Sequence, residues 1–123
     1  MIKHGEIYWV LAKDLDIKHS EQRKDRPYVI VSRDAINQLG KNVVGVPLSS
    51  KTSKANSHRI LIPLAHMIKK DVSCVRPMTD SVALTDHIRV LDPSRFEQPK
   101  MGKMSETAMG GVELGLAFLF DIR

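Results

Sequence analysis

The sequence predicts a mainly β (α+β) fold, a small antiparallel barrel or rolled sheet followed by one C-terminal helix. Three observations carry this prediction. Two of them are that five or six short apolar runs alternate with polar loops at hairpin spacing and that no strand–helix–strand unit repeats. A third is that sustained helical periodicity occurs only near the end of the chain. At 123 residues the chain has the usual length of one domain, ~100–150 residues, so we expect residues 1–123 to form a single domain.

The first two predicted strands flank a long polar loop. Residues 7–11 are apolar, aromatic and β-branched, which is typical of a buried strand. Residues 13–26 are strongly polar and predict a loop, and loops of more than ~12 residues are often functional. Residues 27–32 predict a second strand, which begins at a proline and shows no alternation, a pattern that indicates burial on both faces.

Shorter elements occupy the middle of the chain. Residues 34–39 predict one helical turn that ends at Gly40. Residues 43–48 predict a third strand with a bulge at Gly45, and residues 59–62 predict a fourth.

The segment that follows is ambiguous. Residues 64–80 contain no clear pattern, although their first part, 64–70, could form a short helix. Two more strands are expected at 81–84 and 87–91, and the second alternates apolar and polar residues.

A C-terminal helix is expected from the N-cap Ser105 to Phe120, with an apolar face at positions 108, 112, 116 and 119. Glycines at 110, 111 and 115 each cost the helix ~1 kcal/mol relative to alanine. Either the helix is weak and held by packing, or its backbone lies close to a neighbouring element. We adopt the first interpretation as the expectation.

Composition narrows the class of protein. Nineteen Lys and Arg against 14 Asp and Glu give a formal charge of +5, which favours an acidic partner such as nucleic acid, although many small proteins are basic for solubility alone. One cysteine, Cys74, allows no intrachain disulfide and is expected to be a packed thiol. No apolar run is long enough for a signal peptide or for the ~20 residues that span a bilayer, so a cytoplasmic protein with no membrane partner is expected.

Several site classes lack their motifs. The five histidines form no H-x-x-x-H pair, and no Cys-x-x-Cys, G-x-G-x-x-G, Walker or G-x-S-x-G motif is present. We therefore expect no metal and no cofactor. What remains is two basic polar loops, residues 18–27 and 47–54, each next to a predicted strand.

RNA cleavage suits these loops because the substrate supplies its own nucleophile, the ribose 2′-hydroxyl. The protein must remove that proton, stabilise charge on the phosphate and protonate the leaving 5′ oxygen. Arg26 is the first candidate for the phosphate, since its planar fork stays charged and grips phosphate oxygens. Alternatively, Arg26 is a surface residue paired to Asp25 or Glu21.

Five motifs follow one another along residues 5–120: Gly5-Glu6-Ile7-Tyr8-Trp9-Val10, Ser20-Glu21-Gln22, Arg26-Pro27, Val46-Pro47-Leu48-Ser49-Ser50 and Asp86-His87-Ile88-Arg89-Val90-Leu91-Asp92. In the order and spacing of these motifs the chain resembles the MazF/PemK toxins, the ribosome-independent endoribonucleases (mRNA interferases) of type II toxin–antitoxin pairs. The resemblance implies an SH3-like barrel of the CcdB/MazF type, a homodimer, and sequence-selective, metal-independent cleavage of single-stranded RNA. It also implies a 2′,3′-cyclic phosphate product and a cognate antitoxin.

The resemblance assigns roles to particular residues. Arg26 matches the arginine that acts at the scissile phosphate, and Ser49 matches the position usually held by an assisting threonine. Glu21 and Gln22 match the polar pair of the first loop. Some family members have a histidine immediately before this pair as a catalytic base; here that position is Ser20, and His19, one residue earlier, is the candidate base. The RNA-binding candidates are Gln22, Arg23, Lys24, Ser50, Lys51, Lys54 and Asp86, and a solvated basic face is the alternative for the cations among them.

The chain departs from the family pattern on a later strand. Asp86-His87 stands where an acid–glutamine pair is common, so His87 is a catalytic base, a base-reading group, a sign of lost activity or only a strand residue. Leu84 replaces an arginine that some members use. Two rival functions remain: a CcdB-like gyrase poison, disfavoured because the only tryptophan is Trp9 near the start, and a degenerate member that binds RNA or antitoxin without cutting.

Overall fold

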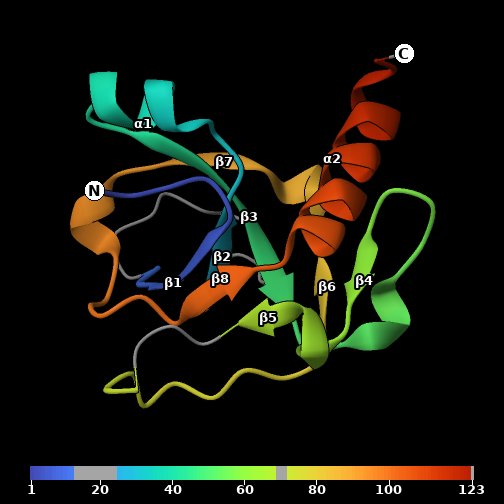
Figure 1. The fold of residues 1–123 in the computed structure, drawn as a ribbon. Coiled ribbons are helices and arrows are strands. Elements are labelled where there is room, and N and C mark those ends of the chain that lie inside the picture. Colours follow the sequence, from blue (N-terminus) through green and yellow to red (C-terminus); the bar gives the residue numbers. More distant parts are fainter. Residues whose placement is uncertain (13–24, 69–71, 123) are drawn as a thin grey trace.

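In the computed structural model, residues 1–12, 25–68 and 72–122 are described, and they form a strongly curved antiparallel sheet with a helix against one side (Figure 1). The eight strands are β1 Glu6–Val10, β2 Arg26–Ile30, β3 Val43–Ser49, β4 Ile60–Ile62, β5 Met67–Ile68, β6 Ser81–Ala83, β7 Arg89–Leu91 and β8 Gly102–Met104. The helices are α1 Asp34–Leu39 and α2 Glu106–Phe120. Four 3₁₀ turns are η2 Thr52–Lys54, η3 Leu64–His66, η4 Thr85–His87 and η5 Pro93–Arg95.

The sheet runs β4-β6-β3-β2-β1-β8-β5, and strand β3 changes partner along its length. Its first part pairs with β7, with Val43 opposite Leu91, and its last part pairs with β6, with Ser49 opposite Val82. Because β3 pairs with β7 along its first part and with β6 along its last part, the sheet curves into a nearly closed barrel. The predicted fold class is confirmed.

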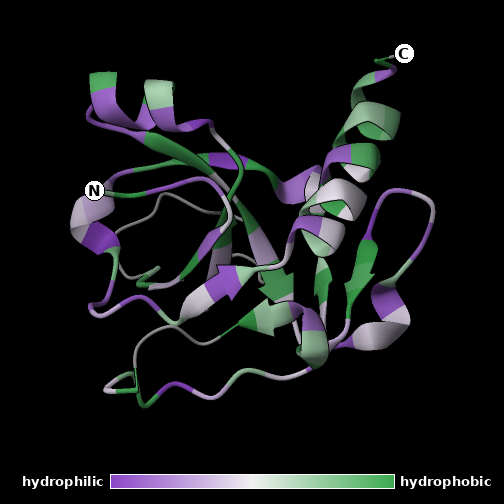
Figure 2. Cartoon of the chain, in the orientation of Figure 1, coloured by the Kyte–Doolittle hydropathy of each residue, from purple (hydrophilic) through white to green (hydrophobic). Residues whose placement is uncertain are grey.

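The central strands are buried on both faces, as the lack of alternation in residues 27–32 predicts. One face, with Ile7 and Val29, packs into a large cluster that includes Val112 of α2; we call it the helix-side cluster. The other face, with Tyr28, packs against Phe96; we call it the Phe96 cluster. Figure 2 shows hydrophobic colour concentrated on strands such as β3, β4 and β6 and hydrophilic colour on many of the connections.

The start of β1 is held by a buried carboxylate. Glu6 is 4% exposed and accepts hydrogen bonds from the Lys3 backbone N–H and the Tyr8 hydroxyl, and it forms an ion pair with Lys100. Burial, with a smaller contribution from the charge of Glu6, raises the pKa of Tyr8 to about 12. These contacts fix the strand that carries Trp9.

Both expected helices are confirmed. The turn at 34–39 is α1 and ends at Gly40, and Ser105 caps α2 by accepting a hydrogen bond from the Ala108 N–H at 3.1 Å. Cys74 is buried, as expected of a packed thiol.

Three local expectations are wrong, and one strand was not expected. The helix considered for 64–70 is not formed by the described part of that segment: after Pro63 the chain makes the 3₁₀ turn η3 and then the short strand β5, and residues 69 and 70 lie outside the described residues. The strand expected at 87–91 begins at Arg89, because His87 belongs to η4. Gly45 marks no bulge, since the pairing on both sides of it stays in register. The short strand β8 has no apolar run in the sequence and depends on pairing with β1 and β5.

The structure also corrects the expectation that the glycines of α2 only mark a weak helix held by packing. A Cβ at Gly115 would lie 2.6 Å from the His58 carbonyl oxygen and 2.9 Å from Cγ1 of Ile60. At Gly111 the nearest atom, on Ile60, is 3.3 Å away, and at Gly110 nothing lies within 4 Å. Close approach of the helix to β4 therefore explains Gly115, whereas a side chain at Gly110 would extend into open space.

This difference predicts opposite effects of two alanine substitutions in one helix. Gly115→Ala should lower the free energy of unfolding by about 1–3 kcal/mol, because the added methyl overpacks against backbone. Gly110→Ala should raise it by up to ~1 kcal/mol through helix propensity. Urea unfolding of both variants at one protein concentration measures the difference, and equal changes of the same sign would contradict it.

Candidate active site

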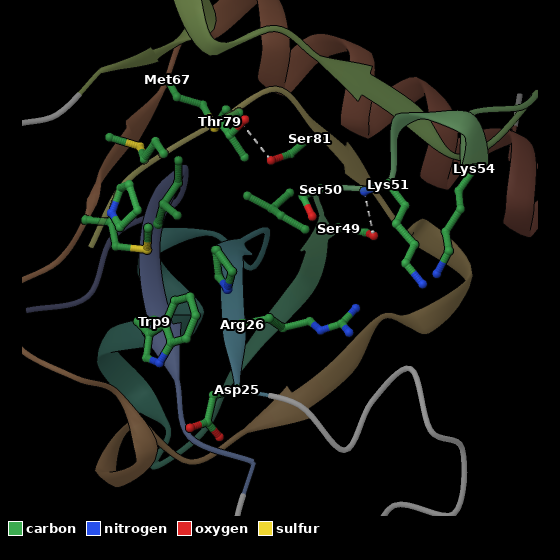
Figure 3. A pocket seen from close by; sticks show the side chains of 16 residues that line it. Trp9, Asp25, Arg26, Ser49, Ser50, Lys51, Lys54, Met67, Thr79 and Ser81 are labelled. Atoms are coloured by element: carbon green, nitrogen blue, oxygen red, sulfur yellow. Dashed lines mark hydrogen bonds between the residues drawn. The ribbon is translucent and has the colours of Figure 1, made fainter. Parts of the chain in front are cut away.

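A cavity of about 360 Å³ lies where β1, β2 and β3 meet the segment before β6 (Figure 3). Its polar and charged lining residues are Asp25, Arg26, Ser49, Ser50, Lys51, Lys54, Thr79 and Ser81, and the cations Arg26, Lys51 and Lys54 lie on one side (Figure 3). Its apolar side is formed by Ile7, Trp9, Pro27, Leu48, Met67, Pro77, Met78 and Met101. One cavity therefore combines a basic rim with an apolar wall.

Arg26 is the first residue of β2 and lies at the rim. Figure 3 shows its side chain extending toward the side of the cavity where Lys51 and Lys54 project. Its charge also acts on Tyr28: burial raises the pKa of that phenol, and the nearby guanidinium groups of Arg89 and Arg26 oppose the rise. Positive charge is thus concentrated at this end of the sheet.

Ser49, the last residue of β3, is held in place by burial and one hydrogen bond. It is 7% exposed, and its Oγ accepts the Lys51 backbone N–H at 3.2 Å. Because the oxygen accepts this bond, the hydroxyl hydrogen can still donate to a bound group. The turn η2 then places Lys54 beside Lys51 at the rim.

The register of β2 and β3 explains why these residues meet. Tyr28 lies opposite Pro47 and Ile30 lies opposite Gly45. Continued by two residues, the same register sets Arg26 across from Ser49. The cavity thus brings together five of the predicted site residues: Arg26, Ser49, Ser50, Lys51 and Lys54.

Two predicted residues lie elsewhere. Asp86 and His87 belong to η4, and neither is among the described residues that line the cavity. Arg59 holds the Asp86 carboxylate with two hydrogen bonds of 2.8 Å, and its Nη2 lies 3.3 Å from Nε2 of His87. These hydrogen bonds from Arg59 hold the pKa of Asp86 below its usual value.

The remaining predicted residues, His19, Glu21, Gln22, Arg23 and Lys24, lie outside the described residues. Within the described ranges, no three His, Cys, Asp or Glu side chains are grouped so that they could hold a metal ion. No helix of the described segments is long and apolar enough to cross a bilayer.

Sequence reasoning missed the apolar wall. Trp9 was expected only as a strand residue, and Pro77 and Met78 belong to the ambiguous segment 64–80. The tertiary fold, not a motif, carries Met67 and Met101 to the same place. The one signal in the sequence was the single tryptophan beside the predicted first loop.

A family model described as "PemK-like, MazF-like toxin of type II toxin-antitoxin system" matches residues 3–120. The chain belongs to this toxin family. The suspected resemblance to MazF/PemK toxins is therefore confirmed, and the match extends over nearly the whole chain.

Solved structures of PemK/MazF toxins share the fold. MazF of Deinococcus radiodurans superposes with a TM-score of 0.72 at 21% identity, covering 98% of this chain and 96% of that chain. An endoribonuclease from a mycobacterial species, in complex with its cognate antitoxin, gives 0.71 at 19% identity over 100% and 98% of the two chains. The Mycobacterium tuberculosis toxin MazF-mt6 gives 0.70 at 15% identity, covering 96% and 98%. At these identities the likeness establishes the fold.

The Arg59–Asp86 pair in this PemK/MazF toxin predicts a pH-dependent contribution to stability. The pKa of Asp86 is lowered in the folded state, so its contribution is complete above the unfolded value of ~3.9 and is lost as the pH falls through the folded pKa. Asp86→Asn should lower the free energy of unfolding by about 0.5–1 kcal/mol at pH 7, and the deficit should shrink below pH ~4. A double-mutant cycle with Arg59→Gln checks this, and additive changes would contradict it.

Proposed function

We propose that the protein is a metal-independent endoribonuclease toxin that cleaves single-stranded RNA and is neutralised by a cognate antitoxin. The observation that carries this proposal is the placement of Arg26 and Ser49 at one cavity, with Lys51 and Lys54 on the same rim. Family membership supports it, since the family comprises toxins of type II toxin–antitoxin systems. We further propose that residues 1–123 act as one domain in the cytoplasm.

In the proposed reaction the ribose 2′-oxygen attacks the adjacent phosphorus. A bond forms between O2′ and phosphorus, the bond from phosphorus to O5′ breaks, and the products are a 2′,3′-cyclic phosphate and a 5′-hydroxyl. Arg26 would bind the non-bridging oxygens, where charge increases as the attacking oxygen arrives, and Ser49 would donate a second hydrogen bond. Lys51 and Lys54 would bind neighbouring phosphates.

Residues other than Arg26 and Ser49 would carry out the two proton transfers of the proposed reaction. His19 and Glu21 belong to the loop that precedes Arg26, and we propose that they exchange protons with O2′ and O5′. His87, held beside Arg59 and away from the residues that line the cavity, would then act on a more distant part of the RNA chain together with Asp86. Gln22, Arg23, Lys24 and Ser50 complete the proposed RNA contacts.

The partners proposed for this chain are suggested by solved structures of the same fold. One structure of the same fold is an endoribonuclease in complex with its cognate antitoxin, and another is a MazE–MazF complex from Deinococcus radiodurans. We propose that this chain forms a homodimer and that its antitoxin covers the basic rim. An acidic segment of the antitoxin would complement the formal charge of +5.

The first test replaces the guanidinium. Arg26→Ala should lower the rate of cleavage of a long single-stranded RNA in EDTA by at least ~100-fold, because a preorganised donor to the phosphate is lost. Arg26→Lys should retain part of the rate, since it keeps the charge but not the planar fork. Lys41→Ala, at an exposed position that does not line the cavity, is the control for loss of one positive charge. Unchanged cleavage by a folded Arg26→Ala protein would refute the assignment.

The second test separates the hydroxyl from the shape of its site. Ser49→Ala should slow cleavage by about 10- to 100-fold, less than Arg26→Ala, because one neutral donor is removed. Ser49→Thr should stay close to the parent, since the hydroxyl remains and the resemblance implies threonine at this position. Single-turnover rates at saturating RNA measure both variants. Equal losses in the two would show that packing, not the hydroxyl, matters here.

The rival functions give different results in the same preparations. A gyrase poison would inhibit supercoiling and leave RNA intact, and the chain has its only tryptophan in β1 rather than at the end of α2. A degenerate member would bind RNA without producing cyclic-phosphate or 3′-phosphate ends. Sequencing of the cut ends reads activity and recognition sequence together.

A further inference from the structure

The apolar wall of the cavity is not needed to bind a phosphate, and its composition points to another group. Beside the basic rim lie the indole of Trp9 and the thioether side chains of Met67, Met78 and Met101. Aromatic and apolar surfaces next to a phosphate-binding rim are what a splayed nucleobase requires, because its faces stack while its edges form hydrogen bonds.

The indole ring of Trp9 packs against Arg76, which is itself held by Glu97. The Arg76 guanidinium lies 4.2 Å from the centre of the indole ring, and Glu97 holds that guanidinium with hydrogen bonds of 3.0 and 2.9 Å. The backbone of Glu97 also donates to the Trp9 carbonyl at 2.8 Å. Arg76 is not among the residues that line the cavity, so the cation occupies a surface of the indole that a ligand in the cavity would not use.

The indole also carries a buried donor without a partner. Among the described residues, no acceptor lies within hydrogen-bond range of Trp9 Nε1, although the atom is buried. A buried donor left unsatisfied costs free energy, and a ligand that brings an acceptor removes this cost. Figure 3 shows the nitrogen-bearing edge of the ring on the side of Asp25, whose carboxylate can accept from a donor on the same ligand.

The dimensions and charge agree with a nucleotide. A cavity of about 360 Å³ is at the small end of the ~300–1,000 Å³ typical of small-molecule sites, which suits a group of nucleobase size. The rim cations Arg26, Lys51 and Lys54 would hold the backbone phosphate of the same nucleotide. A purely apolar ligand would leave the indole N–H without an acceptor and would make no use of the positive charge of the rim.

We propose that this cavity is a nucleobase subsite in which Trp9, braced by Arg76 and Glu97, stacks on one base of the RNA next to the phosphate bound by Arg26. The subsite rests on the proposed function for its RNA substrate but not on cleavage itself. Trp9 is then a base-binding residue, distinct from the phosphate contacts that position the strand.

The chain contains one tryptophan, so its fluorescence reports on this site alone. The probe is a single-stranded oligonucleotide with 2′-O-methyl riboses, which cannot be cleaved by 2′-oxygen attack. Titration with this probe should quench the Trp9 emission, as stacking requires. An abasic oligonucleotide of equal length, which keeps the phosphates, should bind through the rim with little quenching. Equal quenching by both would overturn the proposal.

Variants test the role of the ring and its brace. Trp9→Leu should weaken binding of the base-containing probe by about tenfold to a hundredfold, measured by anisotropy of a labelled probe, while binding of the abasic probe stays within about twofold. Trp9→Phe should restore most of the affinity, because a ring still stacks. Arg76→Met, which removes the brace but leaves Trp9 in place, should reduce quenching. Thermal unfolding by circular dichroism confirms that each variant is folded.

The outcomes separate the two proposals. Base-dependent quenching without RNA cleavage by the parent would support the subsite and refute the endoribonuclease function. Cleavage without base-dependent quenching, or equal loss of base-containing and abasic binding in Trp9→Leu, would refute the subsite and leave the function standing. Failure of both cleavage and quenching would refute both.

Discussion

The hydrogen-bonded register between β2 and β3 is the constraint on which the rest of the structure depends. It aligns Tyr28 with Pro47 and, continued by two residues, brings Arg26 level with Ser49. A slip of one residue would turn every side chain of β2 to the opposite face, exchanging the helix-side cluster for the Phe96 cluster. Since both faces are apolar and packed, no such slip leaves the core intact. The core that stabilises the fold therefore also positions the candidate catalytic pair.

The change of partner along β3 separates two polar sites. Ser49, at the end that pairs with β6, lies at the cavity, whereas the chain beyond β6 turns through η4 and carries Asp86 and His87 away from the lining. Arg59, next to β4, then binds both of these residues.

The cavity has two kinds of surface, a basic rim and an apolar wall. In the proposed function, the basic rim binds any single-stranded nucleic acid, because every nucleotide carries the same phosphate, and this binding depends on salt. In the proposed subsite, the wall around Trp9 contacts the base, whose shape and donor pattern differ from one nucleotide to another. The brace of Arg76 and Glu97 matters in this context: a ring already held in place loses less conformational freedom when a base stacks on it.

The sequence by itself determined the local elements and the chemical candidates. Apolar runs predicted β1, β2 and β3, the N-cap Ser105 predicted α2, and the family motif with Arg26 pointed to RNA. The predictions of the strands and of α2 are confirmed because propensity and capping are local properties, whereas the role of Arg26 toward RNA stays a prediction. Only the tertiary structure decided which residues share a cavity, why Gly115 is glycine, and that residues 64–68 form η3 and β5 rather than an α-helix. Those outcomes depend on contacts between segments far apart in the chain: β5 exists because β8 pairs with it, and the wall of Trp9, Met67, Met78 and Met101 exists because the barrel closes.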